Sequence, residues 1–311
     1  MALLASIDLG TNTFRLLIAE IVTASAFEIR HTENRTVRLG EGFSTERRIR
    51  PVALKRALAA LRAFRTVLDA MEVDQVAATG TSALREAINR DHFLEEAKTQ
   101  CGFDVTILSG EEEARCTLLG VSLLFKDRNE AMRVCDIGGG STEIIGWDGR
   151  KPSFAASLPL GAVALSETFL RSDPPTPGEI AALSAAVEAQ LDKITPPFQI
   201  PCRFVGTAGT VTTFAAIDQE MRHYDPERIN GYLLSAERIK HISDTLSGIP
   251  AKVRAKIPGL EKGREEIILA GGLILSTIMD RFGAEQLTVC DYGLREGVLI
   301  DMFQKLSNSC E

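Results

Sequence analysis

The sequence predicts an α/β protein built from two domains of similar design. Three strand-like segments followed by alternating helices and strands occur twice along the chain, which is the pattern of an α/β fold. The 311 residues are enough for two domains of ordinary size with real cores. A glycine-rich hairpin appears once in each half, and this repeat indicates a duplicated architecture with a ligand between the halves.

The first half begins with three strands. Alternation of apolar and polar residues predicts them at about 2–8, 14–22 and 26–38. A helix is expected from Pro51 to about Met71, since Pro suits the first helical position and Ala and Leu recur at helical spacing. The remaining elements are a strand running into a helix in DQVAATGTSALREAINR, a strand in DVTIL, and a helix of about four turns in SGEEEARCTLLGVSLLF.

The second half repeats this order. Strands are expected at 132–136, 141–147 and 152–158, then helices at 161–170 and 177–194. Later segments are a strand, glycine loop and helix in CRFVGTAGTVTTFAAI, a buried core helix in IILAGGLILSTIM, and a strand running into the last helix in QLTVCDYGLREGVLIDMF. The polar stretch 125–131 is the expected first hinge. The domains are therefore assigned as 1–125 with 297–311, and 126–296.

The composition of the chain argues against several classes of function and partner. Lys+Arg 35 against Asp+Glu 42 gives a net charge of −7, which argues against a DNA partner but not against a small anionic ligand. The longest uncharged apolar run, 267–279, is too short to span a bilayer, so no membrane association is expected. The six cysteines form no C-x-x-C pair and indicate reduced, mostly buried thiols of a cytoplasmic protein.

The stretch VCDIGGGSTEIIGW, residues 134–147, raises the question of a phosphate site. Glycine triplets usually appear where the main chain approaches a ligand closely, and bare N–H groups grip phosphate. A dinucleotide fingerprint is excluded because the β-branched residues after Gly140 predict a strand rather than a helix. Alone, the triplet is explained about as well by a plain hairpin turn.

A second copy of this pattern near the N-terminus favours a phosphate site over a plain hairpin turn. In SIDLGTNTFRLLIAE, Asp8 can be placed on Asp136, which brings Gly10 onto Gly138 and Thr13 onto Ser141. Two unrelated turns rarely share both spacing and residue types. The sequence therefore predicts two phosphate-gripping hairpins, one in each half.

Ten motifs in order resemble the exopolyphosphatase/guanosine pentaphosphatase family of the actin, hexokinase and heat-shock-chaperone ATPase superfamily. They are DLGTNTFRLLIAE, VRLGEGF, GTSALREAINR, SGEEEARCTLLGV, DIGGGSTEIIG, SLPLGAVALSETFLRSDPP, GTAGTVTTFAAI, YDPERING, ILAGG and DYGLREGVL. The resemblance implies two duplicated actin-like (ribonuclease-H-like) α/β domains with a cleft between them. It also implies the short form, without the helical C-terminal extension of longer members.

Some positions depart from the family pattern. Asn230 stands where the family usually has histidine, Glu265 and Glu266 replace a more usual Ala-Asp, and Cys116 is unusual. These departures concern substrate choice rather than the chemistry.

Cleavage of a terminal phosphate needs backbone donors, a cation, an oriented water and a proton acceptor. The glycine loops are expected to supply the donors, each with the alternative of a mere turn. The expected phosphate-binding residues are Gly10, Thr11, Asn12, Thr13, Gly138, Gly139, Gly140, Ser141, Gly206 and Gly209.

Three acids are the candidate metal ligands. Asp8 and Asp136 lie where a strand meets a phosphate loop, and a carboxylate there is repulsive unless a cation such as Mg²⁺ or Mn²⁺ intervenes. The alternative for each is an aspartate that caps its own loop. Glu143 begins the return strand and is a candidate metal ligand or water-orienting catalytic residue.

Glu111–Glu113 open one helix, where acids suit the helix dipole. Ser109 with Glu112 forms a predicted capping box, which accounts for Glu112. Glu113 lies one residue too far for the box, and the resemblance places the family's catalytic base there. Glu113 is therefore the expected general base.

Arginines complete the expected site, because a guanidinium fork can bind two phosphate oxygens. The candidates are Arg15, Arg38, Arg85 and, more weakly, Arg264, whereas Arg47, Arg48 and Arg50 are expected on the surface. The resulting expectation is a metal-dependent phosphohydrolase acting on polyphosphate or guanosine pentaphosphate. The alternatives are a small-molecule kinase of the same superfamily and a non-catalytic polyphosphate or alarmone sensor; a homodimer is what the family suggests.

Overall fold

The chain forms two compact units in the computed structural model, which describes residues 2–23, 26–125, 130–195 and 202–308. One unit comprises Met1–Leu123 with Gly293–Glu311, and the other is Leu124–Tyr292. The chain crosses between them at slightly earlier positions than the expected domain ends at 125 and 296. Most of the expected hinge at 125–131 falls on residues 126–129, which lie outside the described residues.

The first unit is built on a five-stranded sheet in the order β3-β2-β1-β4-β5. The first three strands are antiparallel neighbours, whereas β1, β4 and β5 run parallel. Its strands are β1 Ala2–Leu9, β2 Thr13–Thr23, β3 Ala26–Thr36, β4 Gln75–Gly80 and β5 Val105–Ile107. Its helices are α1 Phe43–Glu46, α2 Pro51–Ala70, α3 Ser82–Glu86, α4 Arg90–Cys101, α5 Gly110–Val121 and α13 Leu294–Asn308.

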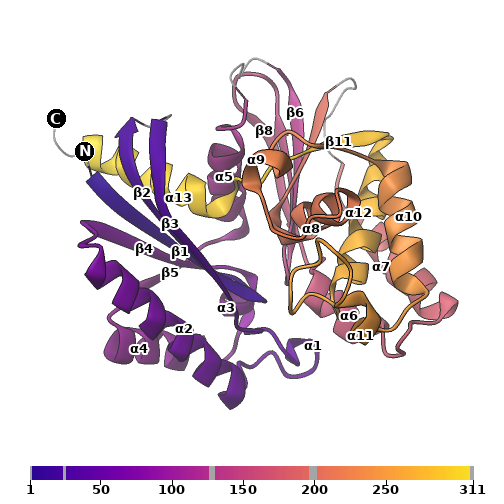
Figure 1. Cartoon of the computed structure of the whole chain (residues 1–311), viewed down its shortest axis with the longest axis horizontal. Helices are drawn as coiled ribbons and strands as arrows, with labels where there is room; N and C mark the ends of the chain where they lie inside the picture. The colour runs from indigo at the N-terminus through magenta and orange to yellow at the C-terminus, as the bar shows by residue number, and fades with distance from the viewer. Residues whose placement is uncertain (1, 24–25, 126–129, 196–201, 309–311) are drawn as a thin grey trace. The chain divides into compact units, whose positions relative to one another are not determined.

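Helices cover both faces of this sheet because successive strand residues point to opposite sides. Ile7 of β1 packs in one cluster with Phe64 of α2, and Leu4 packs in another with Leu299 of α13. Figure 1 shows the last helix, in yellow, beside the indigo strands from the start of the chain. The two ends of the sequence therefore complete one unit.

Helices α5 and α13 approach so closely that only glycine fits at two positions. A Cβ on Gly120 would lie 1.9 Å from the carbonyl oxygen of Gly293, and one on Gly297 would lie 1.7 Å from that of Cys116. Because backbone atoms cannot move aside, these glycines fix the crossing of the two helices.

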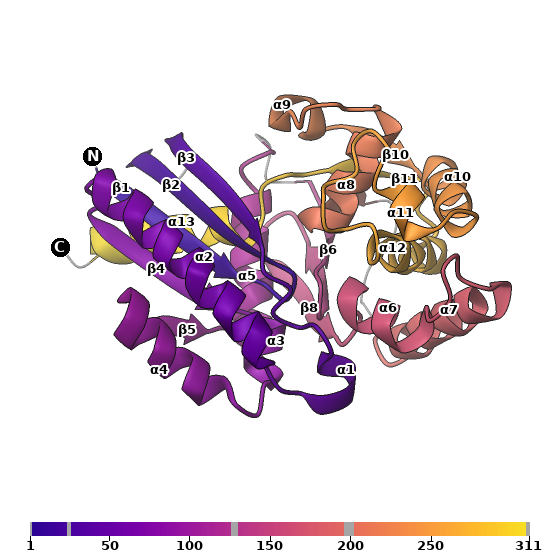
Figure 2. The same cartoon turned by 60° about the horizontal axis from the view of Figure 1, so that its bottom comes forward.

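The second unit holds a six-stranded sheet in the order β10-β11-β9-β6-β7-β8. Its strands are β6 Met132–Ile137, β7 Thr142–Trp147, β8 Pro152–Leu158, β9 Arg203–Thr207, β10 Leu233–Ser235 and β11 Gln286–Val289. Its helices are α6 Ala162–Phe169, α7 Pro177–Leu191, α8 Ala208–Asp218, α9 Pro226–Ile229, α10 Ala236–Ser247, α11 Ala251–Arg254 and α12 Ile268–Phe282. Ile137 and Ile144 of the sheet share one large core with the helical side chains Leu183, Phe214 and Ile274, and Figure 2 shows these helices from a second side.

The two sheets share one design, β3-β2-β1-β4-β5 against β8-β7-β6-β9-β11, so the expected duplicated α/β fold is confirmed. Several elements were not expected: α1, α4, β10 and helices α9, α10 and α11. Helix α5 also ends at Val121, short of the run to residue 125 that the apolar residues suggested.

Two expectations, one about membrane association and one about the cysteines, can be compared with the described residues. None of the helices there is long and apolar enough to cross a membrane. The described cysteines are free thiols, four of them buried and Cys202 partly so. Burial raises the pKa of Cys116 to about 11 and that of Cys135 to about 12, so both stay protonated at neutral pH.

Candidate active site

The expected site residues gather at the carboxyl ends of parallel strands in each unit. In the first unit, Asp8 at the end of β1 lies beside Thr79 of β4, and Gly80 lies beside Ile107 of β5. In the second unit, Asp136 at the end of β6 lies beside Thr207 of β9. Ligands of α/β sheets bind at this edge, where the loops and helix N-termini collect.

The first hairpin loop is held by the segment that follows β3. The carbonyl oxygen of Asn12 accepts hydrogen bonds from the backbone N–H groups of Val37, at 2.9 Å, and Arg38, at 2.8 Å. The carbonyl oxygen of Thr11 accepts from Gly40 N–H at 2.9 Å. Arg38 adopts a positive φ of 50°, which is uncommon for a non-glycine residue and marks a constrained turn. The loop and the expected polyanion-binding Arg38 therefore form one rigid backbone assembly.

Asp8 and Arg15 lie directly opposite each other in the first hairpin. Cross-strand partners in an antiparallel pair project from the same face of the sheet, so the guanidinium and the carboxylate share one side. Gly10 follows immediately, and a Cβ there would lie 2.8 Å from the carbonyl oxygen of Thr13. This close approach explains why the tight turn requires glycine.

The second hairpin loop rests on the start of α6. The carbonyl oxygens of Gly138 and Gly139 accept from the N–H groups of Ala162, at 3.0 Å, and Val163, at 2.9 Å. A Cβ on Gly161 would lie 2.2 Å from the Gly139 carbonyl oxygen. The main chain of the glycine triplet is thus fixed by backbone contacts, as a preorganised phosphate cradle requires.

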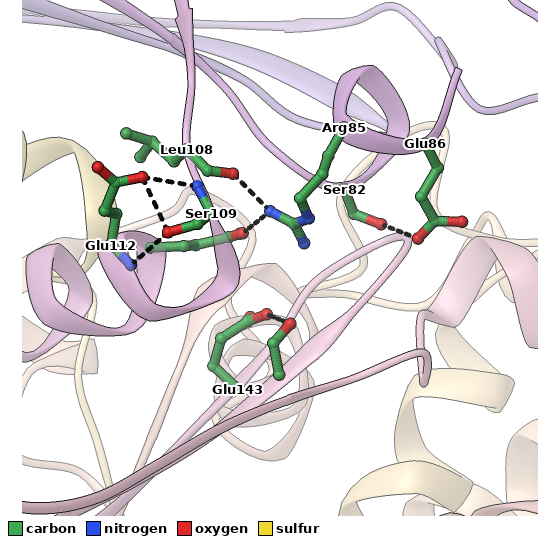
Figure 3. A network of polar contacts seen from close by, with 9 residues as sticks. Ser82, Arg85, Glu86, Leu108, Ser109, Glu112 and Glu143 are labelled. Carbon is green, nitrogen blue, oxygen red and sulfur yellow. Dashed lines mark hydrogen bonds and ion pairs between the residues drawn. The ribbon is translucent and has the colours of Figure 1, made fainter. Parts of the chain in front are cut away.

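Two carboxylates face each other in the second hairpin. Asp136 pairs with Glu143 in the β6–β7 register, and their side chains are 8% and 1% exposed. Glu143 also lies opposite Ser157 of β8, whose hydroxyl donates to Glu143 Oε1 at 2.6 Å (Figure 3). Like charges opposite each other destabilise a sheet, and a bound cation relieves this repulsion.

This pair fits a divalent cation. Mg²⁺ is usually held by one or two carboxylates together with substrate phosphates, rather than by an all-protein cage. Among the described residues, no group of three or more His, Cys, Asp or Glu side chains could hold a metal ion alone. Asp136 and Glu143 therefore offer the kind of incomplete ligand set that a phosphate substrate completes.

The junction of β9 and α8 carries a strained residue. Ala208 has a φ of 65°, in the left-handed region that side chains rarely adopt. A Cβ on the next residue, Gly209, would lie 2.0 Å from the guanidinium of Arg264. Arg264 is 7% exposed and its Nε donates to Glu261 Oε2 at 2.6 Å. Gly209 thus lets an arginine lie directly on the start of α8.

Gly206 has a different role. It lies inside β9, and a Cβ there would meet Val211 at 2.9 Å. Its carbonyl oxygen accepts from Cys290 N–H at 2.9 Å. Close packing and strand pairing account for this glycine, so its expected phosphate contact gains no support from its surroundings.

The start of α5 separates the two neighbouring glutamates. Ser109 and Glu112 form the predicted capping box, with the Glu112 carboxylate accepting from Ser109 N–H at 2.8 Å (Figure 3). Glu112 is exposed, and this backbone hydrogen bond chiefly lowers the pKa of its carboxyl. Glu113, by contrast, is 7% exposed. The cap is confirmed, and it leaves Glu113 outside the box.

Arg85 holds Glu113. Arg85 Nη1 donates to Glu113 Oε2 at 2.8 Å and to the carbonyl oxygen of Leu108 at 2.9 Å. The contact arises because α3 follows β4, α5 follows β5, and the two strands are parallel neighbours. The guanidinium expected to bind a polyanion is thus engaged with the expected base.

Within each unit, the structure brings most of the expected residues to one sheet edge. Asp8, Arg15, Arg38 and the 10–13 loop lie at the first, and Asp136, Glu143 and the 138–141 loop at the second. Sequence reasoning missed Ser157, the strained Ala208 and the Arg85–Glu113 pair. Only Ala208 left a local signal, since it lies within the glycine motif GTAGT.

The chain resembles known proteins over nearly its full length. The sequence pattern of the Ppx/GppA phosphatase family matches residues 17–306. "Exopolyphosphatase 2" of Mycobacterium tuberculosis is 31% identical over 313 residues, covering 96% of this chain and 98% of that protein. A "Putative exopolyphosphatase" of Haemophilus influenzae is 28% identical, covering 96% and 91%.

Solved structures of similar proteins also match nearly the whole chain. A crystal structure of the Aquifex aeolicus member of the Ppx/GppA protein family matches with a TM-score of 0.81 and 34% identity, covering 98% of both chains. An exopolyphosphatase from Cytophaga hutchinsonii matches with a TM-score of 0.89 and 29% identity, covering 97% of this chain and 98% of that one.

Proposed function

Because this chain belongs to the Ppx/GppA phosphatase family, we propose that it is a metal-dependent phosphohydrolase that releases terminal phosphate from inorganic polyphosphate, guanosine pentaphosphate or both. The observation that carries the proposal is the buried Glu113, which Arg85 holds at the start of α5 beside a separate capping residue. A carboxylate placed in this way can take the proton of an attacking water.

Arg85 orients this base. The ion pair with Arg85, at 2.8 Å, fixes one oxygen of the Glu113 carboxylate. An ionised carboxylate has several lone pairs, so Glu113 can still accept the proton of a water molecule. We therefore assign Arg85 a positioning role in addition to any contact with the polyanion.

In the first unit, phosphates would be bound by the 10–13 loop with its arginines. In the second unit, they would be bound by the 138–141 loop, the start of α8 and Arg264. Arg264 lies on Gly209, and Arg38 lies in the segment that holds the first loop. Backbone N–H groups and a helix N-terminus attract phosphate without needing a flexible side chain. Arg15 would offset the charge of Asp8 at the same face.

Asp136 and Glu143 would hold the cation in the second unit, and Asp8 is a separate candidate ligand in the first unit. When bound, Mg²⁺ or Mn²⁺ neutralises developing phosphate charge. The remaining work falls to the protein: the loops position the phosphate chain, and Ser157 keeps Glu143 oriented through its 2.6 Å hydrogen bond.

The rival functions are a small-molecule kinase and a non-catalytic sensor. Phosphate release should be measured with Mg²⁺ and, in turn, polyphosphate, guanosine pentaphosphate and ATP with candidate acceptors. Release from polyphosphate or pentaphosphate without an acceptor supports the proposal. Transfer from ATP to an acceptor without release would show a kinase, and tight binding without turnover would show a sensor.

A matched pair of variants tests the base. Glu113→Gln keeps size but removes the proton acceptor, so turnover should fall by about 10²–10⁴-fold. Polyphosphate affinity should persist or rise, because a negative charge near the polyanion is gone. Glu112→Gln is the control and should leave turnover largely intact. Loss of activity only in Glu112→Gln would show that the base is assigned to the wrong residue.

A further inference from the structure

Arg264, which lies on the start of α8, begins a tight turn that leads into α12. The backbone N–H groups of Ile267 and Ile268 both donate to the Arg264 carbonyl oxygen, at 3.0 and 2.9 Å. The turn is therefore closed by its own hydrogen bonds. Its orientation is fixed once the two residues inside it, Glu265 and Glu266, are held by the rest of the unit.

Two buried side chains from other helices hold this turn. The Ser166 hydroxyl of α6 donates to the Glu266 carbonyl oxygen at 2.7 Å. The Arg254 guanidinium of α11 donates from Nη1 to the Glu265 carbonyl oxygen at 3.3 Å, and from Nε to the Leu246 carbonyl oxygen at 2.8 Å. Ser166 and Arg254 are 7% and 3% exposed. The turn is thus held through two adjacent carbonyl groups by two different helices.

Arg254 is an unusual residue to bury. A guanidinium away from water is costly unless its N–H groups are hydrogen-bonded. Burial lowers the pKa of Arg254, and the Asp173 carboxylate only partly offsets this effect. Asp173 also accepts the backbone N–H of Ala251, at the start of α11, at 2.9 Å. An arginine at such a position indicates a use for its directed N–H donors.

The Glu265 side chain adds a third restraint. Its Oε2 accepts the backbone N–H of Gly263 at 2.7 Å, and Gly263 has a φ of 90°, in the region that favours glycine. Glu265 is one of the two positions that depart from the family's usual Ala-Asp pair, and alanine cannot make this hydrogen bond. The departure therefore ties together the residues on either side of Arg264.

Helix α6 joins this turn to the second phosphate loop. Its first residues, Ala162 and Val163, donate their N–H groups to carbonyl oxygens of the glycine triplet, and both pack with Ile267 in one buried cluster. Ser166 lies one turn further along the same helix. Helices α6 and α12 pack against each other in the second unit (Figure 2). One helix therefore contacts both the second phosphate loop and the turn that begins with Arg264.

We propose that Ser166 and Arg254 are positioning residues that place the Arg264 guanidinium for phosphate binding at the start of α8. Both act through the backbone of the turn rather than by contact with the substrate. A guanidinium that is already held in place loses less side-chain entropy when it binds phosphate. Because α6 also holds the second phosphate loop, this helix fixes two phosphate-binding elements relative to each other. The inference rests on the proposed function, in which Arg264 binds substrate phosphate, and specifies how Arg264 is placed.

The test is a double-mutant cycle on the affinity of the full chain for a methylene-bridged triphosphate, a non-hydrolysable probe, measured by calorimetric titration with Mg²⁺. Arg264→Ala should weaken binding by about 10- to 150-fold, the range of a hydrogen bond to a charged group. Ser166→Ala should weaken it by about 2- to 10-fold, the range of one neutral hydrogen bond. In the Arg264→Ala background, Ser166→Ala should have no further effect, because the residue through which it acts is gone.

Two more variants sharpen the result. Arg254→Lys keeps the positive charge but not the planar fork, so it should weaken binding only when Arg264 is present. Thr168→Ala is the matched control, because Thr168 also lies on α6 and its hydroxyl donates to the Ala164 carbonyl oxygen at 2.7 Å, but on the exposed face. It should leave the affinity unchanged.

Urea denaturation establishes that each variant is folded. If Arg254→Lys does not fold, Ser166→Ala alone decides the result. Equal losses from Ser166→Ala with and without Arg264, or no loss from Ser166→Ala, would overturn the positioning role.

Polyphosphate hydrolysis with Mg²⁺, measured in the same preparations, separates this inference from the proposed function. Ser166→Ala should raise KM more than it lowers kcat, since Arg264 binds substrate and transfers no proton. Hydrolysis by the parent with additive losses in the cycle leaves the proposed function standing and overturns the positioning role. Probe binding with the expected cycle but without hydrolysis does the reverse. A parent that neither binds the probe nor hydrolyses polyphosphate overturns both.

Discussion

The two phosphate hairpins share a backbone but differ in the charge that faces each aspartate. Both turns connect strands in the same register, and the partner of Asp8 is Arg15 whereas the partner of Asp136 is Glu143. The first carboxylate therefore faces a residue of opposite charge within its own hairpin. The second faces another negative charge, which favours cation binding. The two hairpins therefore have the same strand register but differ in the charge of the one side chain opposite the aspartate.

The hairpins also differ in what supports them. Gly40 lets the segment after β3 pack against the side chain of Thr11 in the first loop, since a Cβ on Gly40 would lie 2.4 Å from Thr11 Cγ2. Gly161 lets the second loop pack against the main chain, since a Cβ would lie 2.2 Å from the Gly139 carbonyl oxygen. A side chain can rotate away from a new methyl group, whereas a glycine triplet fixed by hydrogen bonds cannot.

The largest predicted effect follows from the charge difference. Asp136→Asn and Glu143→Gln should lower Mg²⁺-dependent phosphate release by at least about 100-fold, because several kcal/mol of charge stabilisation depend on the cation. Both should also raise the Mg²⁺ concentration needed for half-maximal activity. Asp8→Asn should have a smaller effect on this concentration, since Arg15 faces Asp8.

Activity titrated against Mg²⁺ for all three variants provides the comparison. An Asp8→Asn variant that needs more Mg²⁺ than Asp136→Asn would place the cation chiefly at the first hairpin. The proposed difference between the two hairpins would then be wrong.

An intermediate effect is expected for the supporting glycines. Gly161→Ala should lower the free energy of unfolding by about 1–3 kcal/mol, because the new methyl group has no room against fixed main chain. Gly40→Ala should cost less, since Thr11 can adjust.

Gly178→Ala in α7 is a suitable control. No atom lies within 4 Å of its Cβ position, so the change should be neutral or slightly stabilising. Urea denaturation of the three variants measures the order, and equal losses for Gly161→Ala and Gly40→Ala would contradict the distinction.

The smallest effects concern one helix cap in each unit. Glu112 caps α5 and Glu179 caps α7 with Thr176, and backbone hydrogen bonds lower the pKa of both carboxyls, that of Glu179 to about 2. A carboxyl whose pKa is lower in the folded state than in the unfolded state stabilises the fold at pH values above its unfolded pKa of about 4.3. This stabilisation is lost as the pH falls through the folded value.

The Tm of Glu112→Gln and Glu179→Gln should therefore lie slightly below that of the parent at pH 7, and the difference should shrink between pH 4.5 and 2. For Glu112→Gln the loss at pH 7 should stay below about 1 kcal/mol. Thermal melts across this range measure it. A difference that grows on acidification would show that the carboxylates are not the stabilising form.

Local patterns predicted the hairpins, the α5 cap and most strands, because each depends on residues close in sequence. The short elements α9, α11 and β10 span three or four residues each, too few for a period to register. Helix α4 was missed because the apolar residues of its buried face, Phe93, Ala97 and Cys101, are few among charged ones.

The site was less accessible to sequence reasoning where it depends on pairing between distant strands. Arg85 and Glu113 meet only because β4 and β5 are parallel neighbours, a fact that neither motif contains. The contact of Arg264 with Gly209 likewise joins a late loop to the start of α8. Tertiary packing, not local preference, determines both.

The place of α13 has a consequence for synthesis of the protein. Leu4 and Leu17 of the first strands pack against Leu299, which is translated only after the whole second unit. The second unit is continuous in sequence and can fold as soon as it emerges. The first unit must wait with one apolar sheet face uncovered until the second unit and α13 have been synthesised. The nascent protein is therefore most in need of chaperone protection at the domain that it begins first.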